Sequence, residues 1–97
     1  MTWHVRYEIT LLRIYGGHEK ITFYRDGYIR FKPIENRKIQ IDVCGHPWEL
    51  SIENVQWVPE GLSKIHKAGH YRVSLRSRTC TIGKIEEFRK DKKWYEV

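Results

Sequence analysis

The chain has 97 residues, of which 40 % are hydrophobic and 13 % aromatic, a composition typical of a folded globular protein rather than a disordered one. This length predicts a single domain, residues 1–97, that buries enough apolar surface to fold without disulfide staples. The net charge of +6, from 18 Lys and Arg against 12 Asp and Glu, favours a polyanionic partner.

The N-terminal segment argues against targeting to or across a membrane. Charged residues recur every few positions in residues 1–15, and no run reaches the roughly 20 apolar residues of a membrane-spanning helix. The two cysteines, Cys44 and Cys80, are too few for a disulfide framework and favour two buried thiols, with a single bridge as the alternative. We therefore expect a soluble, cytoplasmic protein that does not bind membranes.

Turn-forming residues divide the chain into short segments rich in Ile, Val, Tyr, Trp and Thr. The breakers are Gly16-Gly17, Asp26-Gly27, Pro33, Gly45 with Pro47, Pro59 with Gly61, Gly69 and Gly83. Such spacing is typical of a sandwich or barrel. We predict an all-β, mainly antiparallel fold of about six to seven strands, arranged as a small bent sheet, barrel or roll.

The clearest strand comes first. Its inward-facing positions are predicted to be Trp3, Val5, Tyr7, Ile9 and Leu11, which alternate with polar residues. Gly16-Gly17 and Asp26-Gly27 are both favoured two-residue hairpin loops, so residues 3–32 are predicted to form a three-stranded meander. In that register Ile9 lies beside Tyr24, and Tyr24 lies beside Ile29, with Phe31 on the same face.

The second face of this meander is predicted to be divided. Its apolar end consists of Leu12, Ile14, Ile21 and Phe23, and its polar end of Arg25, Tyr28 and Arg30. A contiguous apolar patch needs a cover. We expect this cover from Ile85, Phe88 and Trp94, and we expect Tyr28 to remain exposed.

Further strands are predicted at residues 37–43, 48–52 and 70–78, with residues 54–58 continuing the second of these after a bend. A Gly-His-Pro turn is expected between the first two. After Gly83, Ile85, Phe88 and Tyr95 follow a helical spacing, with Glu early and Lys late, as the helix dipole favours. The pattern predicts a short C-terminal helix, with a last strand as the alternative.

The positive charge is concentrated in one acid-free segment, residues 61–85. Its basic residues are Lys64, Lys67, Arg72, Arg76, Arg78 and Lys84. Alternation within 70–78 predicts Arg72, Ser74, Arg76 and Arg78 on one exposed face, where outward residues recur at about 6.6 Å intervals, close to the phosphate spacing of a single nucleic-acid strand. The alternative is a solvated edge strand whose charges prevent aggregation.

We therefore expect a non-catalytic nucleic-acid-binding domain that uses the 64–84 face and prefers single strands. Arg25, Tyr28 and Arg30 would add a ring for base stacking. The sequence carries no RNP-like or cold-shock-like motif. The alternative function is a protein-interaction module, or an inhibitor of a host or cellular factor, that uses the apolar-aromatic hairpin face.

Metal binding and catalysis have little support. Cys44, His46, His66, His70 and Cys80 occur in mixed pairs, unlike the repeated C-x₂-C and H-x₃₋₅-H spacing of a zinc site, so no metal and no cofactor are expected. A Cys44–His46 pair has no third group placed to orient it. Ribonuclease chemistry by His46, His66 and His70 is the enzymatic alternative, but we expect no enzyme activity.

Overall fold

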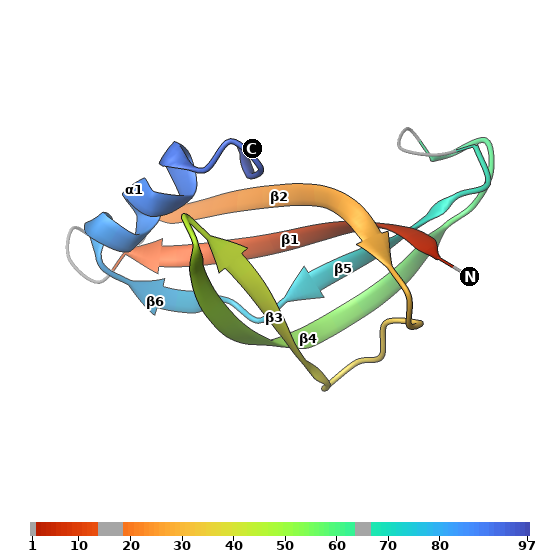
Figure 1. Ribbon diagram of the computed structural model, residues 1–97, viewed down its shortest axis with the longest axis horizontal. Helices are drawn as coiled ribbons and strands as arrows, with labels where there is room; N and C mark the ends of the chain where they lie inside the picture. The colour runs from red at the N-terminus through yellow and green to blue at the C-terminus, as the bar shows by residue number, and fades with distance from the viewer. Residues whose placement is uncertain (1, 14–18, 64–66) are drawn as a thin grey trace.

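The structure of the protein is a computed structural model that describes residues 2–13, 19–63 and 67–97. Seven strands and one helix lie within these residues (Figure 1). In chain order they are β1 (Trp3–Arg13), β2 (Lys20–Ile29), β3 (Lys38–Val43), β4 (His46–Val58), β5 (His70–Leu75), β6 (Arg78–Cys80), α1 (Ile82–Lys90) and β7 (Tyr95–Glu96). Within the same residues, no helix has the length and apolar character needed to span a membrane.

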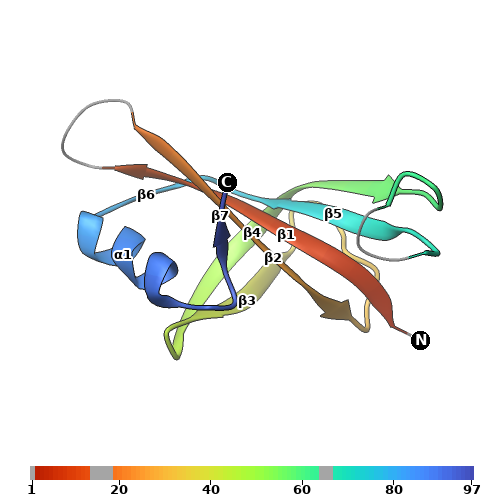
Figure 2. The ribbon, with the colours of Figure 1, turned by 90° about the horizontal axis from the view of Figure 1, so that it is seen from above.

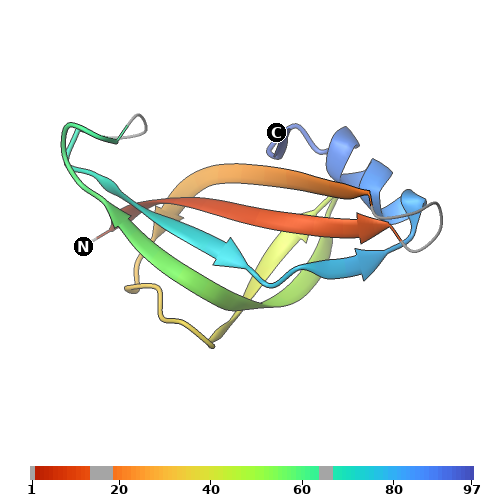
Figure 3. The same cartoon turned by 180° about the vertical axis from the view of Figure 1, so that it is seen from behind.

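The strands form one curled sheet in the order β3-β4-β5-β1-β2-β7, with β6 paired to β1 beyond the end of β5. The β1–β2, β3–β4, β4–β5 and β2–β7 pairs are antiparallel, whereas β5 and β6 run parallel to β1. The sheet bends into a half-barrel, so that the β3–β4 hairpin crosses in front of β1 and β2 (Figures 1 and 3). The predicted all-β class with a short C-terminal helix is confirmed.

The core fills the concave side of the half-barrel. Viewed from above, α1 lies against one end of the curled sheet and closes that end (Figure 2). The buried apolar residues are Val5, Ile9, Leu11, Ile21, Phe23, Ile41, Val43, Trp48, Leu50, Ile52, Val73, Leu75, Cys80, Ile85, Phe88 and Trp94. In the strands predicted at residues 37–43 and 48–52, and in residues 70–75, the alternating apolar residues all belong to this core or pack against it.

The turn of the β3–β4 hairpin consists of Cys44 and Gly45, whereas a Gly-His-Pro turn was predicted. Cys44 and Gly45 have φ of 50° and 78°, as a two-residue hairpin loop requires, and Val43 pairs with His46. His46 and Pro47 therefore begin β4 and do not form the turn. The predicted bend between residues 52 and 54 is present as an irregularity in the β4–β5 pairing.

The predicted hairpin at Asp26-Gly27 is wrong. β2 runs without a break from Lys20 to Ile29, and β1 pairs with it along this whole length, with Asp26 opposite Arg6 and Gly27 opposite Val5. Gly27 is not among the glycines with positive φ. The ion pair of Arg6 with Asp26, at 2.7 Å, stabilises the extended form, so pairing with β1 overrides the local turn preference.

The β1–β2 register also differs by one residue from the predicted one. Ile9 lies opposite Phe23 and not opposite Tyr24, which moves Ile21 and Phe23 to the concave side and Tyr24 to the convex side. The purely apolar side chains thereby enter the core, while Tyr24 stacks on Tyr95 outside it. The predicted Gly16-Gly17 loop lies outside the described residues.

The prediction that the C-terminal segment covers an apolar set is confirmed for Ile21 and Phe23, which are buried together with Ile85, Phe88 and Trp94. It is wrong for Leu12, which the register places on the convex side, and Ile14 is outside the described residues. Phe31, expected in the core, is exposed. Tyr95, expected on the helix, lies in β7 because α1 ends before Asp91.

Candidate nucleic-acid interface

The basic strand does not present its arginines on one face. Glu8 pairs with Ser74 and Leu11 pairs with Arg78, so three steps along β1 correspond to four steps along the β5–β6 segment. The extra residue reverses the alternation, because successive side chains in a strand point to opposite faces. Arg72 lies on the convex side and Arg78 on the concave side, and the predicted common face is wrong.

The three arginines have different surroundings. Arg72 donates two hydrogen bonds to the carboxylate of Glu8, at 3.1 and 2.9 Å. The guanidinium of Arg78 lies 4.8 Å from the centre of the Trp48 ring. Arg76 donates its backbone N–H to the carbonyl of Ser51, and it lines a cavity of about 190 Å³ with Asn36 and Ser51.

The lysines of the predicted 64–84 face are also dispersed. Lys67 precedes β5 and Lys84 lies in α1, and these elements are at opposite ends of a molecule 41 Å long (Figure 1). Lys84 forms an ion pair with Glu87 at 3.6 Å. Lys64 and His66 lie outside the described residues. The described basic residues between 67 and 84 therefore do not make one continuous cationic surface.

Arg25 and Tyr28, predicted to share a face, lie on opposite sides of β2. Arg25 points to the concave side, where it lines a cavity of about 190 Å³ with Tyr7 and its guanidinium lies 5.9 Å from the Trp94 ring. Burial raises the pKa of Tyr7, and the charge of Arg25 opposes this shift. Tyr28 is 70 % exposed, as predicted, and its ring lies 4.5 Å from that of His4.

Two arginines on the convex side of the sheet form ion pairs with carboxylates of the same chain. Arg6 forms two hydrogen bonds with Asp26 and its guanidinium lies 4.4 Å from the Tyr24 ring, so its pKa is raised chiefly by the Asp26 contact. The neighbouring Arg72 is held by Glu8. Because each of these guanidinium groups already has a carboxylate partner, this side is a poor surface for phosphate.

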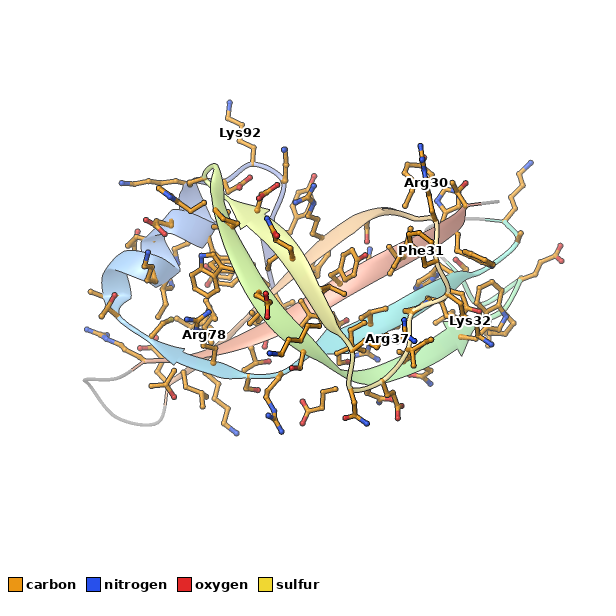
Figure 4. The ribbon with its side chains drawn as sticks, turned by 60° about the horizontal axis from the view of Figure 1, so that its bottom comes forward. Arg30, Phe31, Lys32, Arg37, Arg78 and Lys92 are labelled. Atoms are coloured by element: carbon orange, nitrogen blue, oxygen red, sulfur yellow. The ribbon has the colours of Figure 1, made fainter. Side chains whose placement is uncertain are left out.

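A different cationic surface lies where the chain crosses from β2 to β3. We call it the connection surface and define it as Arg30, Phe31, Lys32 and Arg37. All four residues are exposed, and the side chain of Phe31 is 80 % exposed. Figure 4 shows Arg30, Phe31 and Lys32 where the chain leaves β2, and Arg37 where it enters β3.

The cations of the connection surface are not neutralised. The described Lys and Arg residues with an acidic partner are Arg6, Arg13, Lys38, Arg72, Lys84 and Arg89. In the described part of the chain, Arg30, Lys32 and Arg37 have none. Glu35, the acid within this connection, directs its carboxylate to the backbone N–H of Val55 at 3.5 Å.

Only Arg30 of this surface was a predicted site residue. The others were missed because Phe31 and Lys32 were predicted to lie in the third strand of the meander and Arg37 at the start of the next strand, whereas residues 30–37 form no strand or helix. A signal was available in the basic–aromatic–basic triplet of residues 30–32, which directly follows a strand.

The thiols and the described histidines are not grouped into one site. Cys44 and Cys80 are both free, but Cys44 is exposed, so the expectation of two buried thiols holds only for Cys80. The Cys44 thiol donates to the carbonyl of Glu87 at 3.0 Å, and burial raises the pKa of Cys80. Over the described residues, no three His, Cys, Asp or Glu side chains form a group able to hold a metal ion.

The histidines of the ribonuclease alternative are not brought together either. His70 is buried and its Nδ1 lies 2.7 Å from the hydroxyl oxygen of Ser63. His46 is exposed at the start of β4, in the hairpin that docks on α1. His66 lies outside the described residues.

A scan against protein-family models, a search of curated proteins and a search of solved structures each find no match to this chain. The interface is therefore argued from the geometry and charge of its own residues. The apolar set behind the protein-interaction alternative contributes Ile21 and Phe23 to the core, so these two residues give no free surface.

Proposed function

We propose that the protein binds single-stranded nucleic acid, without catalysis, through the connection surface. The observation that carries this proposal is Phe31, an 80 % exposed ring between Arg30 and Lys32, neither of which has an acidic partner in the described residues. Single-strand binders combine the same two elements, a cationic path for the backbone and aromatic rings on which bases stack.

Each residue has a distinct part in this proposal. The ring of Phe31 stacks on a base, a contact that contributes roughly 1–3 kcal/mol. Arg30, Lys32 and Arg37 contact phosphates, with the guanidinium groups able to form paired hydrogen bonds. Arg76 extends the path, because it lines the same cavity as Asn36, the neighbour of Arg37 in the chain.

A single strand fits this surface better than a duplex. The faces of the bases are stacked and inaccessible inside a duplex, whereas the unstacked bases of a single strand can lie on an exposed ring. An exposed aromatic ring such as Phe31 would add nothing to a surface that contacts phosphates alone.

The proposal predicts a strong salt dependence. Each neutralised phosphate of a single strand contributes about −0.7 to the slope of log K against log salt concentration, so four cations give a slope of about −3. Affinity is then expected to fall roughly 50-fold between 50 and 200 mM salt. Binding through an apolar interface would change little over this range.

Fluorescence anisotropy with labelled 15-nucleotide DNA and RNA tests the proposal. Phe31→Ala should weaken binding roughly 5- to 100-fold, and the combined variant Arg30→Glu, Lys32→Glu, Arg37→Glu should abolish it. The matched control replaces three other exposed cations, Lys90, Lys92 and Lys93, by Glu. Figure 4 shows Lys92 well away from the connection surface. Equal losses in both triple variants would reflect net charge alone and would contradict the proposed surface.

We also propose that the protein works in a reducing compartment such as the cytoplasm. Cys44 carries an exposed free thiol, and such thiols persist where glutathione and thioredoxin keep them reduced. Trapping thiols with an alkylating agent at cell lysis tests this. Recovery of Cys44 in a disulfide would contradict it.

A further inference from the structure

A groove with a polar lining lies away from the connection surface. It has a volume of about 570 Å³ and is bounded by the start of β4, by β6 and by the start of α1. Its polar lining comes from Glu49, Arg78, Thr79, Thr81 and Lys84, beside the ring of Trp48. This volume is within the range of pockets that hold small ligands, roughly 300–1,000 Å³.

Arg78 is held in this groove by a fixed aromatic surface. Its guanidinium lies 4.8 Å from the centre of the Trp48 ring, and that ring is itself buried and packed edge-on against Phe88 at 5.1 Å. Among the described residues, Arg78 has no carboxylate partner. The face of the Trp48 ring does not accept hydrogen bonds from the N–H groups at the edge of the Arg78 guanidinium. These N–H donors therefore remain available to a ligand.

The other charges of the groove are balanced by their own partners. Glu49 forms an ion pair with Lys38 at 3.5 Å, and Lys84 forms one with Glu87 at 3.6 Å. The charge of Arg78 therefore remains in excess.

A hydroxyl group adds a further donor. The hydroxyl oxygen of Thr81 accepts a hydrogen bond from the backbone N–H of Lys84 at 3.4 Å, which leaves its proton free to donate. The groove thus combines a guanidinium fork that lies over a buried ring, a hydroxyl donor and a net positive charge.

We propose that this groove binds a phosphate group, with Arg78 as the principal contact and Thr81 and Lys84 as additional donors. The guanidinium fork matches two oxygens of a phosphate, and a fixed orientation lowers the entropy lost on binding. The phosphate belongs either to a free phosphorylated small molecule or to the backbone of a nucleic acid. This site does not depend on the connection surface, from which Arg78 is remote (Figure 4).

Titrations of the full chain, followed by amide NMR, test the site with three probes: inorganic phosphate, AMP and adenosine. Phosphate and AMP should shift the resonances of Arg78, Thr79 and Lys84, and adenosine should not. Arg78→Ala should weaken AMP binding about tenfold or more. Arg78→Lys keeps the charge but loses the fork, and should recover only part of the affinity. Lys92→Ala is the matched control, because it removes an exposed positive charge that belongs to neither proposed site, and it should bind AMP as the unchanged chain does.

Either of two results would overturn the site. One is the absence of shifts at these resonances with AMP or phosphate, which is read on the unchanged chain and does not depend on a variant folding. The other is equal AMP affinity of the Arg78→Ala variant with an unchanged amide spectrum elsewhere.

Competition identifies the source of the phosphate. If AMP displaces a bound oligonucleotide and Arg78→Ala weakens that oligonucleotide, the nucleic-acid backbone supplies the phosphate to the groove. If AMP binds without displacement, the ligand is a free phosphorylated molecule. An oligonucleotide that fails to bind while AMP still shifts Arg78 would contradict the proposed function and support the groove.

Discussion

The ring of Phe88 in α1 stacks on the ring of Phe23 in β2, with centroids 5.0 Å apart and an interplanar angle of 28°. Phe88 also contacts Trp48 of β4 and Trp94 edge-on, at 5.1 and 5.2 Å. One helical side chain thus joins two strands that lie far apart in the sheet order and the segment that follows the helix. This aromatic cluster explains how the C-terminal segment closes one end of the half-barrel.

Removing the chain after Gly83 should therefore cause aggregation or dimerisation. The truncation uncovers Phe23 and Trp48, and apolar surface left in water costs about 25 cal/mol per Å². Light scattering coupled to size-exclusion chromatography measures the outcome. A truncated chain that stays monomeric and soluble would show that the helix is not a necessary cover.

Substitution of Phe88 by Ala should lower the free energy of unfolding by about 3–5 kcal/mol, because Phe88 is fully buried and the cavity cannot close around three fixed rings. Ile82→Ala is the control on the same helix, since Ile82 is exposed, and it should cost less than about 1 kcal/mol. Urea unfolding followed by tryptophan fluorescence measures both. Similar losses of unfolding free energy for the two variants would show that Phe88 contributes no more to stability than an exposed residue of the same helix.

Stability should fall when the solution is made acidic, because of His70. Burial lowers the pKa of His70 below its usual value of 6.5, as do the charges of Arg6 and His4, while Asp26 opposes the shift. The unfolded chain takes up the proton first. The contribution of neutral His70 is therefore complete above about pH 6.5 and is lost as the pH falls through the lowered pKa of the folded state.

Urea unfolding of the chain and of His70→Gln between pH 8 and pH 5 checks this dependence. The variant should lose less stability over this range than the unchanged chain does, whatever its stability at pH 8. His46→Gln is the control, because His46 is exposed, and should leave the pH dependence unchanged. Parallel pH profiles for the unchanged chain and His70→Gln would exclude His70 as the source.

Replacing both Cys44 and Cys80 by Ala should leave a folded protein that loses at most a few kcal/mol of stability. The cost is expected at Cys80, which is buried, and not at Cys44, whose thiol makes one exposed contact with a backbone carbonyl. Addition of a chelator should not change the melting temperature of the unchanged chain. Stoichiometric zinc in the purified protein would contradict this expectation.

The parts of the fold that follow from strand alternation could be predicted from the sequence. Val5, Ile9 and Leu11 are buried because each strand buries every second side chain, and the local pattern alone carries that information. The helical spacing of Ile85 and Phe88 likewise predicted the two buried residues of α1. Which strands pair with one another depends on contacts between residues far apart in the sequence. The local pattern of apolar and polar residues does not give this information.

The candidate site was harder to predict because it depends on single-residue steps. One extra residue between β5 and β6 separates Arg72 from Arg78, and no sequence feature announces it. The absence of the predicted Asp26-Gly27 hairpin separates Arg25 from Tyr28, because residues three apart in one continuous strand point to opposite faces. The connection surface was missed for a different reason, since Lys32 and Arg37 were predicted to lie in strands and instead lie in a segment that forms neither strand nor helix.

Substitution of Gly27 tests the extended path of β2 directly. Gly27 lies within β2, has no positive φ, and a Cβ added to it would meet no atom within 4 Å. Gly27→Ala should therefore be neutral or should stabilise the protein by up to about 1 kcal/mol, because Ala reduces the entropy of the unfolded chain.

Gly69 is the contrasting position. Its φ is +100°, and a Cβ there would lie 2.5 Å from the carbonyl oxygen of Val58 and 2.6 Å from the Trp57 ring. Gly69→Ala should cost roughly 2 kcal/mol or more. Urea unfolding of both variants measures the difference. A hairpin at Asp26-Gly27 would require positive φ at Gly27 and would make Gly27→Ala destabilising by about 1–2 kcal/mol, so the sign of that one change decides between a continuous strand and a turn.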